Sequence, residues 1–91
     1  MQVLPGSVTS YKRTPIFDQS TVPPGLLKAH QTKAGVWGKI IVLEGRLLYR
    51  ILEPTIEEVV LAVGDVAIVE PQVLHEVTPL GEVRFCVDFY K

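Results

Sequence analysis

The sequence predicts an all-β domain, and three observations lead to that prediction. The 91 residues contain 20 valines and isoleucines but only four alanines, and β-branched side chains suit a pleated sheet better than a helix. Apolar segments alternate with glycine- or proline-containing turns every ~8–12 residues, a spacing typical of a β-sandwich or barrel. In the last segment, residues 82–90, apolar and polar residues alternate with the period of a strand.

Six strands follow from the positions of the turns. Each turn contains Gly, which allows a positive φ angle, or Pro, which fixes φ at about −65°. We therefore expect strands at residues 36–43, 46–52, 56–63, 66–70, 73–78 and 82–90. Residues 39–43 are apolar on both faces, so that strand should be central in the sheet and covered on both sides.

The length allows a single domain, which we assign to residues 1–91. Four of the seven prolines lie in residues 1–24, so we expect this part to form an extended arm at the edge of the sheet. A domain of this size buries only about 60% of the surface of its unfolded chain. We therefore expect a homodimer that covers further apolar surface.

Charge and cysteine content exclude several classes of protein. Nine basic and ten acidic residues leave a net charge of −1, whereas a nucleic-acid-binding surface needs a clear excess of Lys and Arg. No apolar run approaches the ~20 residues of a membrane span, and no secretory signal is visible. Cys86 is the only cysteine, which excludes an internal disulfide and a cysteine-rich zinc site. We expect a cytoplasmic protein without nucleic-acid or membrane partners.

Two stretches resemble the paired motifs of the cupin β-barrel family. The second motif is matched in spacing: Gly64 is followed after five residues by a tripeptide centred on Pro71, and His75 follows after two more. Three identities differ, because the family has Pro, Gly and Asn where this chain has Glu70, Gln72 and Pro79. The spacing of the motif is therefore better preserved than its residues.

The first cupin motif is matched less closely. Gly45 stands at its closing glycine, and Gly38 stands where the metal-binding glutamate would be. The His-x-His pair falls on residues 31 and 33 or, with one inserted residue, on residues 30 and 32. We prefer the second register because it places His30 at a ligand position. Two of the four usual metal ligands then remain, His30 and His75.

A more specific similarity covers nearly the whole chain. Residues 30–40, 42–45 and 70–75 resemble the cupin-like domain that precedes some TehB-type tellurite-resistance methyltransferases and also occurs as short stand-alone proteins. Residues 11–15 and 84–90 match that group as well. The resemblance implies a small antiparallel cupin β-barrel or jelly-roll sandwich, with a link to tellurite or oxidative stress. We expect no methyltransferase domain in 91 residues, and a Gly-rich cofactor loop is absent.

The leading functional interpretation is a pocket that binds a small molecule or an oxyanion. The two histidines and Trp37 would line it, and Lys33 or Arg50 would supply positive charge. Arg46 and Arg50 share one face of a strand, and guanidinium groups bind oxyanions through two parallel hydrogen bonds. If this face points inward, the two arginines form an anion site. If it points outward, they are ordinary surface charges.

The alternative interpretation is a metal-dependent cupin enzyme. His30 and His75 can hold Zn²⁺, Ni²⁺ or Fe²⁺ only with a third protein ligand or several waters. Glu44, Glu70 and Glu76 are the candidates for the third ligand. Glu76 adjoins His75, and adjacent strand residues point to opposite faces, so it would need a bulge to reach the same metal. Whether the chain is an enzyme stays open at this point.

Two further interpretations concern the exterior of the barrel. The domain could act as a regulatory or partner-docking module. Cys86 lies two residues from Arg84 on the same strand face, and a thiol with a lowered pKa could react with tellurite. A lone cysteine on a strand is, however, more often a small buried apolar side chain.

Overall fold

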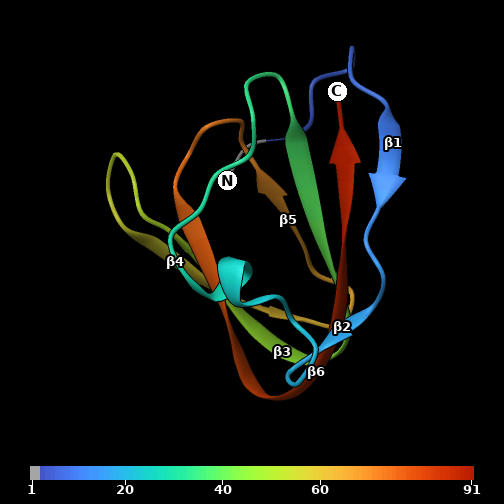
Figure 1. Cartoon of the computed structure of the whole chain (residues 1–91), viewed down its shortest axis with the longest axis vertical. Coiled ribbons are helices and arrows are strands. Elements are labelled where there is room, and N and C mark those ends of the chain that lie inside the picture. Colours follow the sequence, from blue (N-terminus) through green and yellow to red (C-terminus); the bar gives the residue numbers. More distant parts are fainter. Residues whose placement is uncertain (1–2) are drawn as a thin grey trace.

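The computed structural model describes residues 3–91, which form a β-sheet and one short 3₁₀ helix (Figure 1). The all-β prediction is confirmed. The elements are β1 (Ser10–Arg13), β2 (Phe17–Asp18), η1 (Pro24–Leu27), β3 (Trp37–Ile51), β4 (Glu57–Ala62), β5 (Val66–Val69) and β6 (His75–Tyr90). Within residues 3–91, no helix is long and apolar enough to cross a membrane.

The two long strands, β3 and β6, form the spine of the fold. They pair antiparallel from Trp37 opposite Tyr90 to Ile51 opposite His75. The free edge of β3 pairs with β5 and then with β4, and the free edge of β6 pairs with β1 and β2. Both long strands bend, as the U-shaped course of β6 in Figure 1 shows. The single sheet is thereby folded into two half-sheets that face each other.

Four of the predicted strands are merged into these two long ones. Residues 36–43 and 46–52 contribute to β3, and residues 73–78 and 82–90 contribute to β6. The predicted breaks between them are wrong, because the ladder between β3 and β6 continues past both turn signals. The register shifts twice in β3 where the sheet bends.

Gly45 makes the bend of β3 possible. Its φ angle is +74°, and a Cβ atom at this position would lie 2.0 Å from the backbone oxygen of Glu82 on β6. Only glycine combines this backbone conformation with so close an approach. The residue that marks a turn in the sequence therefore acts as a bulge inside a continuous strand.

The inner faces of the two half-sheets form the core. On β6, Val83, Phe85 and Val87 alternate with outward residues as predicted, and Phe85 is 0% exposed. β3 is central in the sheet, also as predicted. Its outer face is not fully covered, since Leu43 is 40% exposed. The predicted homodimer stays a prediction.

Residues 23–36 cross the open side between the half-sheets. This segment contains η1 and continues to His30, which forms an isolated β-bridge with His75. The amide of Gln72 also donates a hydrogen bond to the carbonyl of Thr32. The segment therefore closes one side of the space between the two half-sheets.

Candidate functional site

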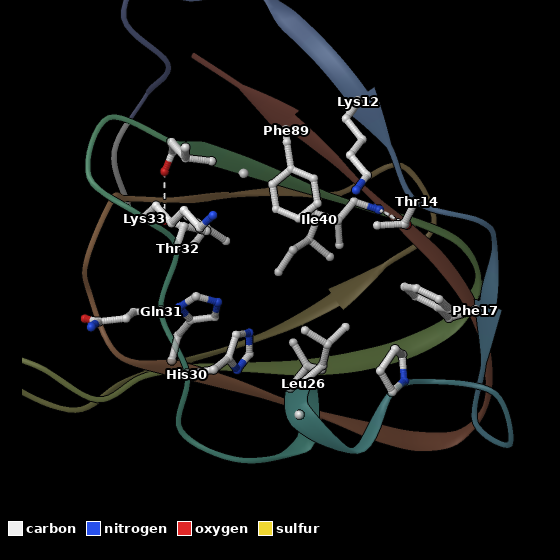
Figure 2. Close-up of a pocket in the computed structure, with 18 of the residues that line it drawn as sticks. Lys12, Thr14, Phe17, Leu26, His30, Gln31, Thr32, Lys33, Ile40 and Phe89 are labelled. Carbon is white, nitrogen blue, oxygen red and sulfur yellow. Dashed lines mark hydrogen bonds between the residues drawn. The ribbon is translucent and has the colours of Figure 1, made fainter.

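A cavity of about 450 Å³ lies between the half-sheets (Figure 2). Its walls are the inner faces of β3, β5 and β6, the edge strands β1 and β2, and residues 23–36 with η1. Pockets of about 300–1,000 Å³ with mostly apolar walls and a few polar groups are typical of small-molecule sites. This cavity is therefore the candidate site, and the position of each polar group in it decides what it can bind.

His30 and His75 meet at one side of the cavity. Each backbone amide donates a hydrogen bond to the carbonyl of the other residue, over 3.0 and 2.9 Å. Their ring centroids lie 4.1 Å apart and the ring planes make an angle of 60°. Both rings line the cavity, so the structure brings the two predicted histidines together.

Backbone carbonyls determine which nitrogen of each imidazole ring carries the hydrogen. Nδ1 of His30 lies 2.8 Å from the carbonyl oxygen of Lys28, and Nδ1 of His75 lies 2.9 Å from that of Val73. A carbonyl oxygen only accepts hydrogen bonds, so each Nδ1 carries a hydrogen. When the ring is neutral, each Nε2 can therefore accept a hydrogen bond or serve as a metal ligand.

His75 is neutral at pH 7. Its side chain is almost fully buried, and burial lowers its pKa to about 4. The hydrogen bond to Val73 acts in the opposite direction, and the proximity of His30 lowers the pKa further. A charged imidazolium is thus disfavoured at His75.

Lys12 and Lys33 bring positive charge to the mouth of the cavity. Both residues are exposed and both line the cavity. Lys12 stands opposite Phe89 of β6, whose ring also lines the cavity, and Figure 2 shows the two lysine side chains on either side of that ring. Among residues 3–91, no Asp or Glu side chain lines the cavity.

The deeper wall of the cavity is apolar. Phe17 of β2 and Phe85 of β6 pack edge to face, with ring centroids 5.7 Å apart and planes at 63°. Leu26 of η1 points into the cavity from the side across from Lys12 (Figure 2). Ile40, which is 2% exposed, adds a buried aliphatic surface from β3.

Two residues that the sequence assigned to the pocket lie elsewhere, and their assignment is corrected. Trp37 is on the outer face of β3, because its neighbour Gly38 lines the cavity and adjacent residues face opposite sides. Arg50 does not line the cavity. Its Nη1 lies 3.1 Å from Oε1 of Glu76, and its Nε lies 3.0 Å from Oε2 of Glu58.

No third metal ligand joins the two histidines in the part of the chain that the structure describes. No group of three His, Cys, Asp or Glu side chains that could hold a metal ion is found there. Glu76 binds Arg50, Glu44 lies 3.6 Å from Arg84, and Glu70 does not line the cavity. Catalytic zinc sites use three protein ligands. Any metal here would need its remaining positions filled by water or by a bound molecule.

Of the two interpretations of Cys86, the structure agrees with the favoured one, a small buried apolar side chain, and not with a reactive thiol. The side chain is 2% exposed, and burial raises its pKa above the ordinary value. The charge of Arg13 lowers the pKa by a smaller amount, and the nearby carboxylate of Asp88 raises it. The thiol is therefore protonated at neutral pH, and its role is that of a small apolar side chain.

Lys12 is the charged cavity residue that sequence reasoning missed, and the apolar lining residues Phe17, Leu26 and Ile40 were not assigned to the site either. Nothing in the local sequence around Lys12 distinguishes it from an ordinary edge-strand lysine. Its inward direction depends on its pairing with Phe89 of β6 and on a register shift between Ser10 and Lys12. The alternation of residues in β6 predicts which side of the sheet Phe89 faces. The side that Lys12 faces could be predicted only by knowing that β1 pairs with β6.

The chain is similar to proteins of known sequence and structure. Residues 12–87 match the family model described as the TehB-like domain. The probable S-adenosyl-L-methionine-dependent methyltransferase TehB of Haemophilus influenzae is 33% identical over 85 residues, which are 88% of this chain and 30% of that protein. The crystal structure of TehB from Haemophilus influenzae superposes with a TM-score of 0.87 at 30% identity, covering 93% of this chain and 32% of that chain.

Two further structures share the fold. A protein of Escherichia coli K12 superposes with a TM-score of 0.91 at 21% identity, covering 100% of this chain and 97% of that chain. A cupin-2 domain-containing protein of Shewanella frigidimarina superposes with a TM-score of 0.55 at 13% identity, covering 92% and 65% of the two chains. The fold is therefore a small cupin fold. The chain spans 30% of the length of the curated relatives it matches.

Proposed function

The chain belongs to the TehB-like family, and we propose that it binds a small anion in the cavity between its half-sheets. One observation carries the proposal: the charged side chains at the cavity are Lys12 and Lys33, without a carboxylate from the described residues to neutralise them. An anion at the mouth gains attraction from both ammonium groups and meets no like charge on the wall.

The nearby acidic residues support this charge pattern. The carboxylates of Glu58 and Glu76 are bound by Arg50, and that of Glu44 lies near Arg84. Their negative charge is therefore partly neutralised away from the cavity. Because the family resemblance links the domain to tellurite, tellurite belongs among the anions to test, together with simple carboxylates.

Isothermal titration calorimetry with sodium benzoate and sodium tellurite tests the proposal, with benzamide as the uncharged counterpart of benzoate. We expect Lys12→Met and Lys33→Met each to weaken anion binding by about tenfold, since a charge-assisted hydrogen bond contributes about 1.5 kcal/mol. Lys39→Met is the matched control, because Lys39 lies outside the cavity with its Nζ 5.6 Å from the Tyr90 ring centroid.

Three results would overturn the proposal. The first is that no anion binds the wild-type protein at millimolar concentration. The second is that benzoate and benzamide bind equally. The third is that the control Lys39→Met weakens binding as much as the two cavity variants. A circular dichroism spectrum of each variant separates lost binding from lost folding.

A second candidate function is metal binding, favoured by the two Nε2 atoms that the carbonyls of Lys28 and Val73 leave free at the cavity wall. Metal-bound histidines commonly donate their other ring N–H to a carbonyl. Elemental analysis of untagged protein, purified without chelator, tests this candidate alongside His75→Ala. About one equivalent of a transition metal that is lost in the variant supports metal binding. Absence of metal from both samples, even after soaking, rules it out.

A further inference from the structure

The size of the cavity bears on which anion fills it. At about 30 Å³ per water molecule, a volume of about 450 Å³ corresponds to roughly fifteen waters. An inorganic oxyanion is only a few waters in size. It would leave most of the cavity to water in contact with Phe17, Leu26 and Phe85, which is unfavourable for apolar walls.

Charge and apolar surface are separated along the depth of the cavity. Lys12 and Lys33 are exposed and lie at the mouth. The floor consists of side chains that are almost fully buried, with Phe85 at 0%, Ile40 at 2% and Val69 at 3% exposed. Figure 2 shows Lys12 reaching down from β1 and Leu26 reaching up from η1 toward the same space. A ligand that satisfies both ends needs a charged end and a hydrocarbon end.

The imidazole pair favours the same orientation. His30 and His75 line the cavity, and both Nδ1–H groups are already bound to backbone carbonyls. Neither Nδ1–H is therefore available to the carboxylate of a ligand. The charged end of the ligand is better placed at the two lysines.

We propose, on the basis of the anion-binding function proposed above, that the ligand is an amphipathic organic carboxylate. Its carboxylate lies at the mouth between Lys12 and Lys33, and its hydrocarbon body packs on Phe85 of the floor and on the partly buried Phe17 and Leu26. Arylalkanoates and medium-length alkanoates are the chemical class with this shape. Inorganic oxyanions occupy only the mouth.

Titration with acetate, butanoate, hexanoate and 3-phenylpropionate tests this inference. Burial of a methylene group strengthens binding by about fourfold, so each step of two methylenes should strengthen it by about fifteenfold. We expect 3-phenylpropionate to bind at least as tightly as hexanoate, and tellurite to bind no more tightly than acetate.

Leu26→Ala tests the apolar end separately. It should weaken 3-phenylpropionate binding about fivefold and leave acetate binding unchanged. Leu27→Ala is the matched control, because Leu27 belongs to the same turn, is 40% exposed and does not line the cavity. It should change neither affinity.

The outcomes separate this inference from the proposed function. If acetate and tellurite bind but longer carboxylates bind no more tightly, the amphipathic ligand is wrong and the anion site remains. If 3-phenylpropionamide binds as tightly as 3-phenylpropionate, the charge at the mouth has no role and both proposals are wrong. Absence of binding by the whole series also overturns both.

Discussion

Arg13 on β1 binds the carboxylate of Asp88 on β6 through both Nε and Nη2, with a distance of 2.8 Å for the Nη2 hydrogen bond. Asp88 is only 4% exposed although it lies on the outer face of the sheet. The hydrogen bonds and charge of Arg13 hold the pKa of the Asp88 carboxyl below its usual value. The adjacent pair, Lys12 and Phe89, faces the cavity, so this contact anchors the strand that carries Lys12.

The first prediction concerns this anchor. Asp88→Asn should lower the free energy of unfolding by about 1–2 kcal/mol, because the ion pair is lost and the neutral amide offers Arg13 one acceptor oxygen in place of two. Benzoate binding should weaken a few-fold, although Asp88 does not line the cavity. Urea denaturation and calorimetry measure the two effects. Glu44→Gln removes the exposed pair with Arg84 and should change stability by less than about 0.5 kcal/mol.

The second prediction concerns the bend in β3. Gly45→Ala should lower the free energy of unfolding by about 3–5 kcal/mol, because the new methyl group would collide with the backbone of β6. Gly64→Ala is the matched control: its φ angle is +92°, but no atom lies within 4 Å of the added Cβ. It should lower stability by about 1–2 kcal/mol from the backbone conformation alone. Equal denaturation midpoints for the two variants would contradict the close approach at Gly45.

The third prediction concerns pH. The pKa of His75 is about 4 in the folded state and about 6.5 when the residue is exposed. As the pH falls from 6.5 to 4, the unfolded chain takes up a proton that the folded chain does not. Stability should therefore fall by about 2–3 kcal/mol over this range.

Urea denaturation at several pH values, with chelator present to keep the imidazoles free of metal, measures this loss. His75→Gln removes the titrating group, so its stability should depend less on pH between 6.5 and 4. Asp18 and Asp88 act mainly below this window, because their pKa values are lower than the ordinary 3.8. A variant with the same pH slope as the wild type would show that His75 is not responsible.

The fourth prediction distinguishes the cavity from the outer face. Arg50→Met should leave benzoate affinity unchanged, because Arg50 lies among Glu58 and Glu76 outside the cavity. Its stability should change by about 1 kcal/mol at most, as expected for partly exposed ion pairs. If Arg50→Met weakened benzoate binding as much as Lys12→Met, the anion site would lie on the outer face instead.

The direction of Arg50 illustrates what the sequence could not predict. In the first half of β3, Gly38, Ile40 and Val42 face inward, whereas in the second half Leu47 and Tyr49 do. The two register shifts between Val42 and Leu47 move the inward face from even to odd positions. A strict period of two would have turned Arg50 inward. Because a bulge involves the partner strand, its position is not encoded in the local pattern.

Other parts of the fold could be predicted from local chemistry. The positions of β4 and β5 follow from the turns at Pro54 and Gly64, and the inward residues of the last strand follow from alternation. The cupin motif spacing also pointed to both histidines. Gly45 was identified as a site of positive φ, but the sequence alone does not distinguish a glycine that ends a strand from one that bends it.

The two half-sheets share β3 and β6, so the walls of the cavity are covalently continuous. Residues 23–36 close one side of the space between them, and local opening of this segment would widen the cavity beyond its mouth at Lys12 and Lys33. Three backbone hydrogen bonds join this segment to the start of β6 and the turn before it, two between His30 and His75 and one from Gln72 to Thr32. Amide hydrogen exchange at residues 30, 72 and 75 would report the opening of this short ladder directly, and slower exchange with a ligand bound would show that the segment is stabilised by the occupied cavity.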